Sequence, residues 1–395
     1  MTMRIGYFST EFPYLDPRTG KILASYPYGG VENGTYQLAK QLAKKGHDVF
    51  VFTTSSENRD TYEEYGNIHI YRYSKCFSVG QAPISLGLLY KPIFSRINLD
   101  IAHAQLGNLP APLTGYGYSK WNNIPCVVSY HADWDGSFGS LSRRFGVFLF
   151  NRFLCDYLLS NADKVIALSK EHALESKILN KYLDNLVFIP NGLNLEEFEI
   201  SYTKQQCRKN LCLPMAAKII LFVGSLNPIK APDVLIRSMK TVLDSIPDAY
   251  LVIVGDGMMK QELTELAKKL SIEDSVQFTG FISRDKSQYY KAADVFVLPS
   301  RRESFGNVLL EASASCLPVI VSNVEGVKAI VQGGYNGLFA RIGDEIDLAQ
   351  KIVYLLQNEE IRKEMGQNAR KLCEAFTWDA VATETERLYV SLLDK

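Results

Sequence analysis

Two glutamates frame the segment of this chain best suited to chemistry, Glu303-Ser-Phe-Gly-Asn-Val-Leu-Leu-Glu311. A predicted strand ends shortly before it, and a helix is predicted to begin near Asn307. The N–H groups at such a helix start can hold a phosphate. Glu311 falls on the apolar side of this helix, where a carboxylate is costly unless it binds something such as a pair of ribose hydroxyls.

Three further turns follow predicted strands or precede predicted helices, and they carry residues that suit an anion. Gly29-Gly30 precedes a helix, so its backbone can approach an anion closely. Lys230 lies beyond a strand that ends at Gly224, and Gly255 opens a turn after another strand. Taken singly, these features are better explained as an ordinary loop, a solvated lysine and a tight turn, and no G-x-G-x-x-G spacing is present.

Short apolar runs alternate with amphipathic helices and predict the elements that must position these residues. The predicted strands are Arg4–Ser9, Asp48–Thr53, Ile68–Tyr73, Leu99–His103, Cys126–Tyr130, Lys164–Leu168, Leu186–Ile189, Lys218–Val223, Tyr250–Val254, Val276–Thr279, Asp294–Leu298 and Pro318–Ser322. The predicted helices are Asn33–Lys45, Asp233–Leu243, Lys260–Leu270, Asn307–Ser315 and Thr377–Leu393. This order predicts an α/β chain with two Rossmann-like, doubly wound parallel sheets, which bind ligands beyond the carboxyl ends of their strands.

Length and composition bound the organisation and the partners. The 395 residues suffice for two domains, which we place at 1–195 and 196–375, with a helix over 376–395 that crosses back to the first domain. Lys+Arg and Asp+Glu are both 43, so no basic excess points to nucleic acid. The chain shows no signal peptide and no apolar run of membrane-spanning length, and its seven cysteines are dispersed, so we expect a cytoplasmic protein.

Taken together, these stretches resemble the retaining glycosyltransferases of family 4, whose GT-B fold sets two Rossmann-like domains face to face across a cleft. The most specific mark is the E-x7-E element from Glu303 to Glu311. The resemblance covers nearly the whole chain, and its supporting matches are Gly29-Gly30-Val31, Asp100-Ile-Ala-His103, Val187-Phe-Ile-Pro-Asn191-Gly192, Gly224 with Lys230, Val254-Gly-Asp-Gly257, Phe278-Thr-Gly280-Phe281, and the pair Phe376 and Trp378.

The resemblance implies a nucleotide-sugar donor and assigns roles to individual residues. Glu311 should hold the donor ribose, and Glu303 should face the hydroxyls of the transferred sugar. Lys230 should neutralise the diphosphate, which Gly30 approaches from the first domain. A lone histidine at a strand end is more often structural, but His131 falls at the family's histidine near the sugar and the leaving group, and this match reverses that preference. The backbone of four residues should meet the sugar and the phosphates: Phe305, Gly306, Asn307 and Val308.

One position departs from the family pattern. The family usually has an arginine directly after the glycine at Gly224, paired with the lysine on the diphosphate, and this chain has Ser225 there. Arg301 or Arg302 could supply the missing charge. We nevertheless place four further residues in the donor site: Gly29, Gly224, Ser225 and Gly255.

Breaking a glycosyl–phosphate bond leaves negative charge on the diphosphate, which the site must stabilise. Lys230 and two helix N-termini can do so, and the D-x-D spacing of Asp133 and Asp135 lies beside His131 rather than at a strand end. We therefore predict that the reaction needs no metal and no cofactor. The family implies retained anomeric configuration, and with no evident catalytic base the leaving phosphate could serve. A UDP-sugar is preferred as donor from its frequency in the family, and a GDP-sugar stays open.

The acceptor is less well specified, and we expect a sugar or a lipid-linked acceptor bound mainly by the first domain. The basic and aromatic stretch Arg143–Leu154 could rest on an anionic membrane, at the inner face of the cell membrane. A core helix is favoured instead, because Asn151, Arg152 and Asp156 interrupt any clean apolar face. The hydrophobic stretch Ala82–Phe94 is similarly ambiguous.

Two rival functions stay open. One is another GT-B enzyme, such as a disaccharide phosphorylase or a nucleotide-sugar epimerase. The other is a non-catalytic subunit that binds a sugar nucleotide, for which Ser225 is the motive. The presence of Glu303, Glu311, Lys230 and His131 argues against this second rival.

Overall fold

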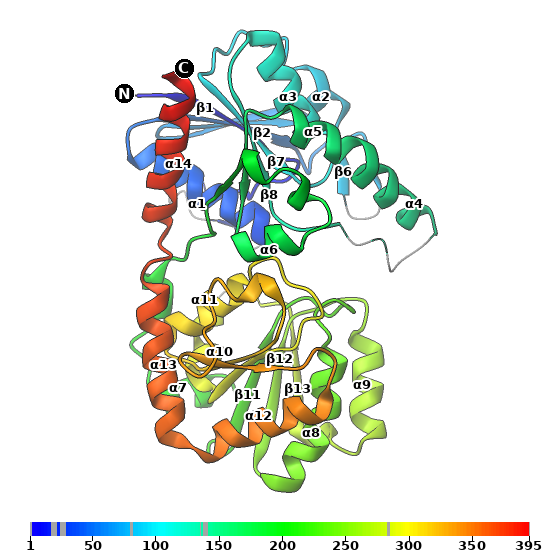
Figure 1. Ribbon diagram of the computed structural model, residues 1–395, viewed down its shortest axis with the longest axis vertical. Coiled ribbons are helices and arrows are strands. Elements are labelled where there is room, and N and C mark those ends of the chain that lie inside the picture. The colour runs from blue at the N-terminus through cyan, green and yellow to red at the C-terminus, as the bar shows by residue number, and fades with distance from the viewer. Residues whose placement is uncertain are drawn as a thin grey trace. The chain divides into compact units, whose positions relative to one another are not determined.

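A computed structural model describes residues 2–16, 22–23, 29–79, 82–134, 136, 141–282 and 285–394 of the chain. The chain divides into two compact units, of which the first comprises residues 1–192 and 378–395 and the second residues 193–377. Each unit is a sheet with helices on both faces (Figure 1). The predicted α/β class is therefore confirmed.

The first unit is built on an eight-stranded sheet with the order β10-β9-β8-β7-β1-β2-β4-β3. The strands are β1 (Arg4–Phe8), β2 (Asp48–Thr54), β3 (Thr61–Tyr65), β4 (Ile68–Tyr73), β7 (Ile101–Leu106), β8 (Cys126–Tyr130), β9 (Lys164–Ala167) and β10 (Leu186–Phe188). All neighbours are parallel except β3 and β4. Strand β3 was not predicted, because its sequence Thr-Tyr-Glu-Glu-Tyr is polar and half-buried at the sheet edge. A separate hairpin pairs β5 (Phe77–Val79) with β6 (Ala82–Ile84).

The helices of the first unit are α1 (Gly30–Lys44), α2 (Leu86–Tyr90), α3 (Ala111–Asn122), α4 (Leu141–Leu149), the π-helix η1 (Phe150–Cys155), α5 (Asp156–Asn161), α6 (Lys170–Glu175), the 3₁₀ turns η2 (Leu179–Lys181) and η3 (Leu183–Asn185), and α14 (Trp378–Leu393). The final helix, α14, packs against α1 and buries Val381 and Tyr389 in this unit. The last helix of the chain thus completes the core of the first sheet.

The second unit holds a six-stranded, wholly parallel sheet with the order β13-β12-β11-β14-β15-β16. Its strands are β11 (Lys218–Val223), β12 (Ala249–Val254), β13 (Val276–Gly280), β14 (Val295–Leu298), β15 (Val319–Ser322) and β16 (Gly337–Ala340). Its helices are α7 (Lys204–Asn210), α8 (Pro232–Ser245), α9 (Lys260–Lys269), α10 (Lys286–Ala292), α11 (Asn307–Ala314), α12 (Glu345–Gln357) and α13 (Glu359–Cys373), with 3₁₀ turns η4 (Leu195–Phe198), η5 (Glu273–Ser275) and η6 (Glu325–Val327).

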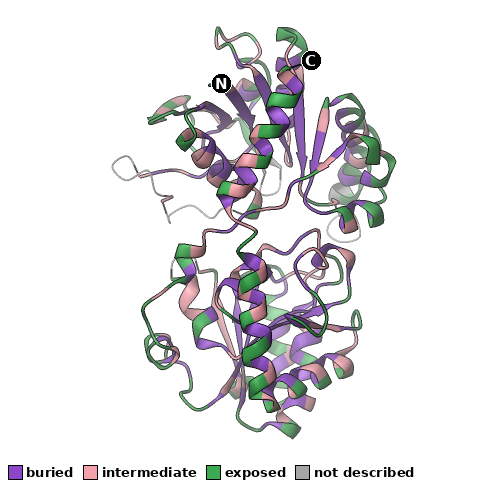
Figure 2. Ribbon diagram, turned by 60° about the vertical axis from the view of Figure 1, so that its left-hand side comes forward, coloured by how far each residue is buried: buried purple, intermediate pink, exposed green. Residues whose placement is uncertain are grey.

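Strands β11 and β14 are neighbours, although the chain visits β12 and β13 between them. The order therefore reverses at β11 and β14, and their carboxyl ends form the topological switch point where ligands bind in such sheets. The central strands of both sheets are buried, whereas the helices show exposed outer faces (Figure 2).

The expectation of a core helix over Arg143–Leu154 is wrong for one face of that helix. Its inner face buries Val147 and Phe150, but Phe145 and Phe148 are 62% and 59% exposed on the outer face. In the described part of the chain, no helix combines the length and the apolar character that crossing a membrane requires.

Gly255 allows a close approach of the turns that follow β11 and β12. It has φ +149°, and a Cβ built on it would lie 1.9 Å from the carbonyl oxygen of Gly224. We expect Gly255→Ala to lower the free energy of unfolding by about 2 kcal/mol or more, through backbone strain and overlap. Gly334→Ala is the matched control, since Gly334 has φ +80° and open space around it. Equal losses in urea-induced unfolding of the two variants would contradict the role of the close approach.

Candidate active site

An ion pair lies at the switch point of the second unit. Lys230 follows β11 and Glu303 follows β14, and the Lys230 Nζ lies 2.5 Å from the Glu303 Oε2. The side chains of these residues are 25% and 10% exposed. The structure therefore brings together two predicted site residues that are distant in the sequence, because their strands are neighbours in the sheet.

The loops that carry this ion pair are bonded to each other. The side-chain oxygen of Asn227 accepts the N–H groups of Ile229 and Lys230 at 3.0 and 3.1 Å, which shapes the turn before α8. The N–H of Arg301 donates to the carbonyl of Ile229 at 2.7 Å. The loop of Glu303 is also packed tightly, since a Cβ on Gly326 would lie 1.8 Å from the Glu303 carbonyl oxygen.

Ser225 is exposed beside the turn that begins at Gly255. The N–H of Gly224 donates to the carbonyl of Val254 at 3.0 Å, and the N–H of Leu226 donates to the carbonyl of Asp256 at 2.9 Å. These bonds place Gly224, Ser225 and Gly255 together at the carboxyl ends of β11 and β12.

The two arginines considered as replacements for the missing cation lie at the surface. The Arg301 guanidinium donates to the carbonyl of Pro228 at 2.7 Å and lies 3.4 Å from the carboxylate of Asp233. Arg302 is exposed. Arg301 is therefore held against the loop that carries Lys230.

Helix α11 begins at the loop of Glu303. Gly306 precedes it with φ +88°, a left-handed conformation that favours glycine. The side chain of Phe305 is buried and its ring centroid lies 6.0 Å from that of Phe376, so Phe305 can offer only its backbone to a ligand. Asn307 and Val308 form the first turn, at the positive end of the helix dipole.

Glu311, one turn further along α11, is held from both sides by α10. Its carboxylate oxygens lie 2.6 Å from the Lys286 Nζ and 2.6 Å from the hydroxyl of Tyr290. Burial, followed by the charge of Glu311, raises the pKa of Tyr290 well above its usual value, so this hydroxyl remains a donor. Sequence reasoning missed Lys286 and Tyr290, and their only signal is the i,i+4 spacing that places them on one helix face.

In the first unit, His131 follows β8 and its Nε2 lies 2.7 Å from the Gln105 Oε1 on β7. Burial lowers the pKa of His131 to about 4. His131, Gln105 and Asn191 line a pocket of about 30 Å³ within this unit. Near neutral pH His131 is therefore uncharged and can donate or accept a hydrogen bond without adding a cation.

A second histidine lies behind His131 in a buried polar network. The His103 Nδ1 lies 2.5 Å from the hydroxyl of Tyr389, and its Nε2 lies 2.7 Å from the Oγ of Ser129. The Tyr389 hydroxyl is also 3.0 Å from that of Tyr7. Burial, with a smaller contribution from His131, lowers the pKa of His103 to about 3. The terminal helix α14 thus supports the strand that carries Gln105.

The Gly29-Gly30 turn differs from the simple anion site that the sequence suggested. The N–H of Gly29 donates to the Glu32 Oε2 at 2.8 Å, so a carboxylate of the same helix already binds the start of α1. Burial raises the pKa of Glu32. Gly30 is exposed as the first residue of α1.

The acidic pair with D-x-D spacing is described only in part, because Asp135 lies outside the described residues. Asp133 accepts hydrogen bonds from the hydroxyls of Tyr130 and Ser176 at 2.6 and 2.7 Å. The residues that the structure describes contain no cluster of three or more His, Cys, Asp or Glu side chains that could hold a metal.

Two family profiles match the chain. That of the "Glycosyl transferases group 1" matches residues 203–372, and that of "Glycosyltransferase Family 4" matches residues 28–197. An uncharacterized glycosyltransferase of Methanocaldococcus jannaschii is 30% identical, with 98% of each chain covered. The N-acetyl-alpha-D-glucosaminyl L-malate synthase of Bacillus anthracis is 28% identical, over 90% of this chain and 92% of that protein.

Solved structures share the fold at lower identity. Sucrose-phosphate synthase from Thermosynechococcus elongatus is 24% identical, with a TM-score of 0.78 and 99% of each chain covered. Anabaena HepE, solved in complex with UDP-glucose, is 21% identical, with a TM-score of 0.73 over 99% of this chain and 100% of that one.

His103 and His131 make stability sensitive to acid. Their pKa values in the folded state lie below the usual 6.5, so the unfolded chain binds protons that the folded chain does not between about pH 4 and 6.5. Stability is therefore lost as the pH falls below 6.5, by at most about 2 kcal/mol per histidine at pH 5. We expect His131→Gln to lose less stability than the wild type between pH 7 and 5 in urea-induced unfolding. The two proteins should run parallel between pH 7 and 8, and parallel profiles down to pH 5 would refute the assignment.

Proposed function

Since the chain belongs to the family 4 glycosyltransferases and has the GT-B fold, we propose that it transfers a sugar from a nucleotide-sugar donor to a sugar or lipid-linked acceptor. The observation that carries this proposal is the Lys230–Glu303 pair at the switch point, with Glu311 on the helix that follows. The diphosphate of a donor needs a cation, which Lys230 supplies. The hydroxyls of the sugar need a hydrogen-bond acceptor, which is Glu303, and the ribose hydroxyls need a second carboxylate, which is Glu311.

In the proposed reaction, the bond between the sugar C1 and the diphosphate oxygen breaks while the acceptor oxygen bonds to C1. The acceptor attacks from the side of the leaving group, which retains the configuration, and its proton passes to a diphosphate oxygen. Lys230 and the N-terminus of α11 stabilise the charge that develops on the diphosphate. His131, being neutral, contributes a hydrogen bond near the sugar.

The ion pair holds the side chains of Lys230 and Glu303 at the positions where they would bind the donor. A diphosphate would offer Lys230 a second anion, and the Glu303 carboxylate would then accept hydrogen bonds from sugar hydroxyls. Glu303 also receives a hydrogen bond from the Ser300 hydroxyl at 3.4 Å, which orients its carboxylate. Because position 225 is serine, Lys230 lacks the arginine partner that is usual in the family, and donor affinity should depend strongly on Lys230.

A UDP-sugar is the donor that we favour. The structure of HepE that shares this fold was solved with UDP-glucose, which supports the choice. The names of two relatives differ: one is an N-acetyl-alpha-D-glucosaminyl L-malate synthase, and another, from Streptomyces scabiei and 33% identical over 59% of this chain and 54% of that protein, is a D-inositol 3-phosphate glycosyltransferase. These names do not identify the acceptor of this chain.

The two rival functions predict different reactions. A disaccharide phosphorylase would cleave its substrate only with phosphate, and an epimerase would interconvert two donors without an acceptor. A non-catalytic subunit would bind the donor and turn over no acceptor. Glu303 distinguishes the transferase from this last rival, because donor binding alone does not require a carboxylate at the sugar.

The donor should be found by thermal stabilisation against a panel of UDP-, GDP- and ADP-sugars. Ligand that binds the folded state raises the unfolding temperature, so the true donor should stand out without its acceptor. Glu311→Gln should weaken its binding about tenfold or more, because a hydrogen bond to a charged group is lost. A panel in which no sugar nucleotide shifts the wild-type unfolding temperature would count against the proposal.

Replacing Glu303 by alanine should reduce transfer about a hundredfold or more, since an interaction with the reacting sugar is lost. Circular dichroism should show an intact fold. Glu265→Ala is the control, because Glu265 lies exposed on α9 of the same unit and should leave turnover unchanged. Near-normal turnover in Glu303→Ala would remove the role assigned to Glu303.

The proposed stabilisation of the leaving group requires no metal ion. We expect turnover with the identified donor to be the same with and without EDTA, because Lys230 and the α11 N-terminus supply the positive charge. The measurement is the initial rate of nucleotide release after dialysis against EDTA. A rate that is lost in EDTA and restored by Mn²⁺ would show that this electrostatic account is incomplete.

A further inference from the structure

A row of large apolar side chains faces outward from the first unit. It runs along α4, η1 and α5, which follow one another without a break over residues 141–161. Phe145, Phe148 and Phe153 are 62%, 59% and 61% exposed, whereas Val147 and Phe150 between them are buried. A helix at the surface of a domain normally turns polar residues outward. This helix turns large apolar side chains outward as well as inward, with the exposed Arg144 and Arg152 among the outward ones.

The row continues over the neighbouring helix α3. The Tyr157 ring of α5 meets the Tyr116 ring at a centroid distance of 5.4 Å, and the Lys120 Nζ lies 5.3 Å over Tyr116. Beside Lys120, the exposed rings of Trp121 and Phe94 meet at 5.3 Å. We call these exposed rings on neighbouring elements the aromatic–basic surface: Phe94, Trp121, Phe145, Phe148, Phe153 and Tyr157, with the cations among them.

Exposed large hydrophobic side chains are concentrated in the part of the chain that forms this surface. Of the 25 large hydrophobic side chains that are exposed in the described part of the chain, 11 lie between residues 86 and 157. Such a contiguous exposed apolar region marks an interaction site more often than scattered single residues do.

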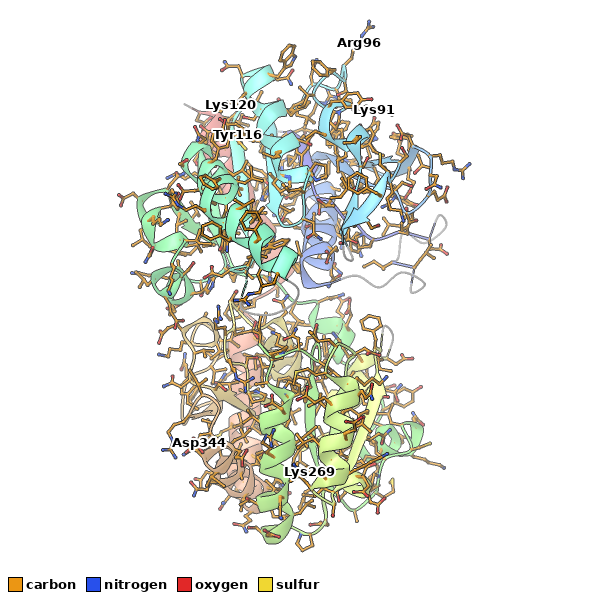
Figure 3. The ribbon with its side chains drawn as sticks, turned by 90° about the vertical axis from the view of Figure 1, so that its right-hand side faces the viewer. Lys91, Arg96, Tyr116, Lys120, Lys269 and Asp344 are labelled. Atoms are coloured by element: carbon orange, nitrogen blue, oxygen red, sulfur yellow. The ribbon has the colours of Figure 1, made fainter. Side chains whose placement is uncertain are left out.

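The surface is also basic, although the whole chain is neutral. Between residues 82 and 155 the sequence carries six cations and three carboxylates, which are Lys91, Arg96, Lys120, Arg143, Arg144 and Arg152 against Asp100, Asp133 and Asp135. Asp100 accepts the N–H of Arg4, and Asp133 accepts two hydroxyls, so both are engaged within the unit. Figure 3 labels Lys91, Arg96, Tyr116 and Lys120 in the α2–α3 region, where Arg96 points away from the body of the unit.

Carboxylates at the borders of the surface have partners of their own. Asp60 forms an ion pair with Lys91 at 2.6 Å, and Asp156 bonds to the hydroxyl of Tyr182 and lies 3.5 Å from the Lys181 Nζ. The cations that face outward beside the rings are therefore Arg96, Lys120, Arg144 and Arg152, each of which is exposed.

We propose that the aromatic–basic surface docks on an anionic lipid bilayer. Aromatic rings with cations among them suit the boundary between headgroups and acyl chains, where the rings enter the apolar layer and the cations meet lipid phosphates. A second copy of the chain is a poorer occupant, because two-fold association through this face would set like charges against each other. A protein partner would have to supply carboxylates beside an apolar face, whereas an anionic bilayer offers phosphates beside an apolar layer at any position.

The proposal goes beyond the transfer reaction, because vesicle binding needs neither donor nor acceptor. One consequence rests on the proposed function, namely that a chain held on a bilayer would meet acceptors linked to lipid. Vesicle binding and donor turnover are therefore measured separately, so that failure of one is distinguished from failure of the other.

The test is co-sedimentation of the full chain with vesicles of phosphatidylcholine, with and without one third phosphatidylglycerol. We expect binding to the anionic vesicles that weakens as salt is raised. The variant Phe145→Ser/Phe148→Ser/Phe153→Ser should bind about tenfold or more weakly, because it removes three exposed rings that would enter the apolar layer of the bilayer. Its matched control, Tyr202→Ser/Tyr335→Ser/Tyr354→Ser, removes three exposed rings from the second unit and should bind as the wild type does. Lys120→Glu should weaken binding, whereas Lys269→Glu on α9 should not.

Four results would overturn the proposal. One is no binding to the anionic vesicles, and another is equal binding by the phenylalanine variant and the wild type. The third is a concentration-dependent dimer, seen by light scattering, that the phenylalanine variant abolishes, since the face would then be a protein interface. The last is loss of vesicle binding when millimolar soluble glycerol phosphate is added, because the chain would then recognise the lipid headgroup alone and not a bilayer surface.

Discussion

The ion pair between Lys230 and Glu303 is the interaction on which the candidate site depends. Both charges are largely withdrawn from water, and removing either would leave the other without compensation, at a cost of about 3 kcal/mol for a fully buried pair and less here, since Lys230 is a quarter exposed. The pair exists because β11 and β14 are neighbours at the switch point of the second sheet. Gly326 lets the loop of Glu303 approach, and Asn227 shapes the loop of Lys230.

The two units use different electrostatics. In the second unit the carboxylates of Glu303 and Glu311 each meet a lysine, so the site is a set of compensated charges that a charged ligand can rearrange. In the first unit His131 and His103 are kept neutral by burial and are oriented by Gln105 and by the hydroxyls around them. A donor diphosphate needs the lysine-containing environment of the second unit. The neutral histidines of the first unit form hydrogen bonds within that unit and add no charge to it.

The chain as a whole is neutral, but one local surface is basic and aromatic. The chain has equal numbers of acidic and basic residues, yet the outer face of α4 and its neighbours joins exposed rings to cations. Whole-chain composition averages this region with the rest. The arrangement becomes evident only when the helix is seen to bury one apolar face and expose another.

The sequence by itself determined the fold class, the order of most strands and the residues of the E-x7-E element. Strands such as Cys126–Tyr130 and Lys218–Val223 were predicted to the residue, because they are buried almost throughout and are mostly apolar in sequence. The polar edge strand β3 carries no such signal. The partners of the site residues became known only from the structure, namely Lys286 and Tyr290 beside Glu311 and Glu32 beside Gly29. The exposed apolar face of α4 likewise became known only from the structure. The reason is that hydrogen bonds and the burial of side chains depend on neighbours in space. The order of the strands sets these neighbours, and the local periodicity of the sequence does not encode them.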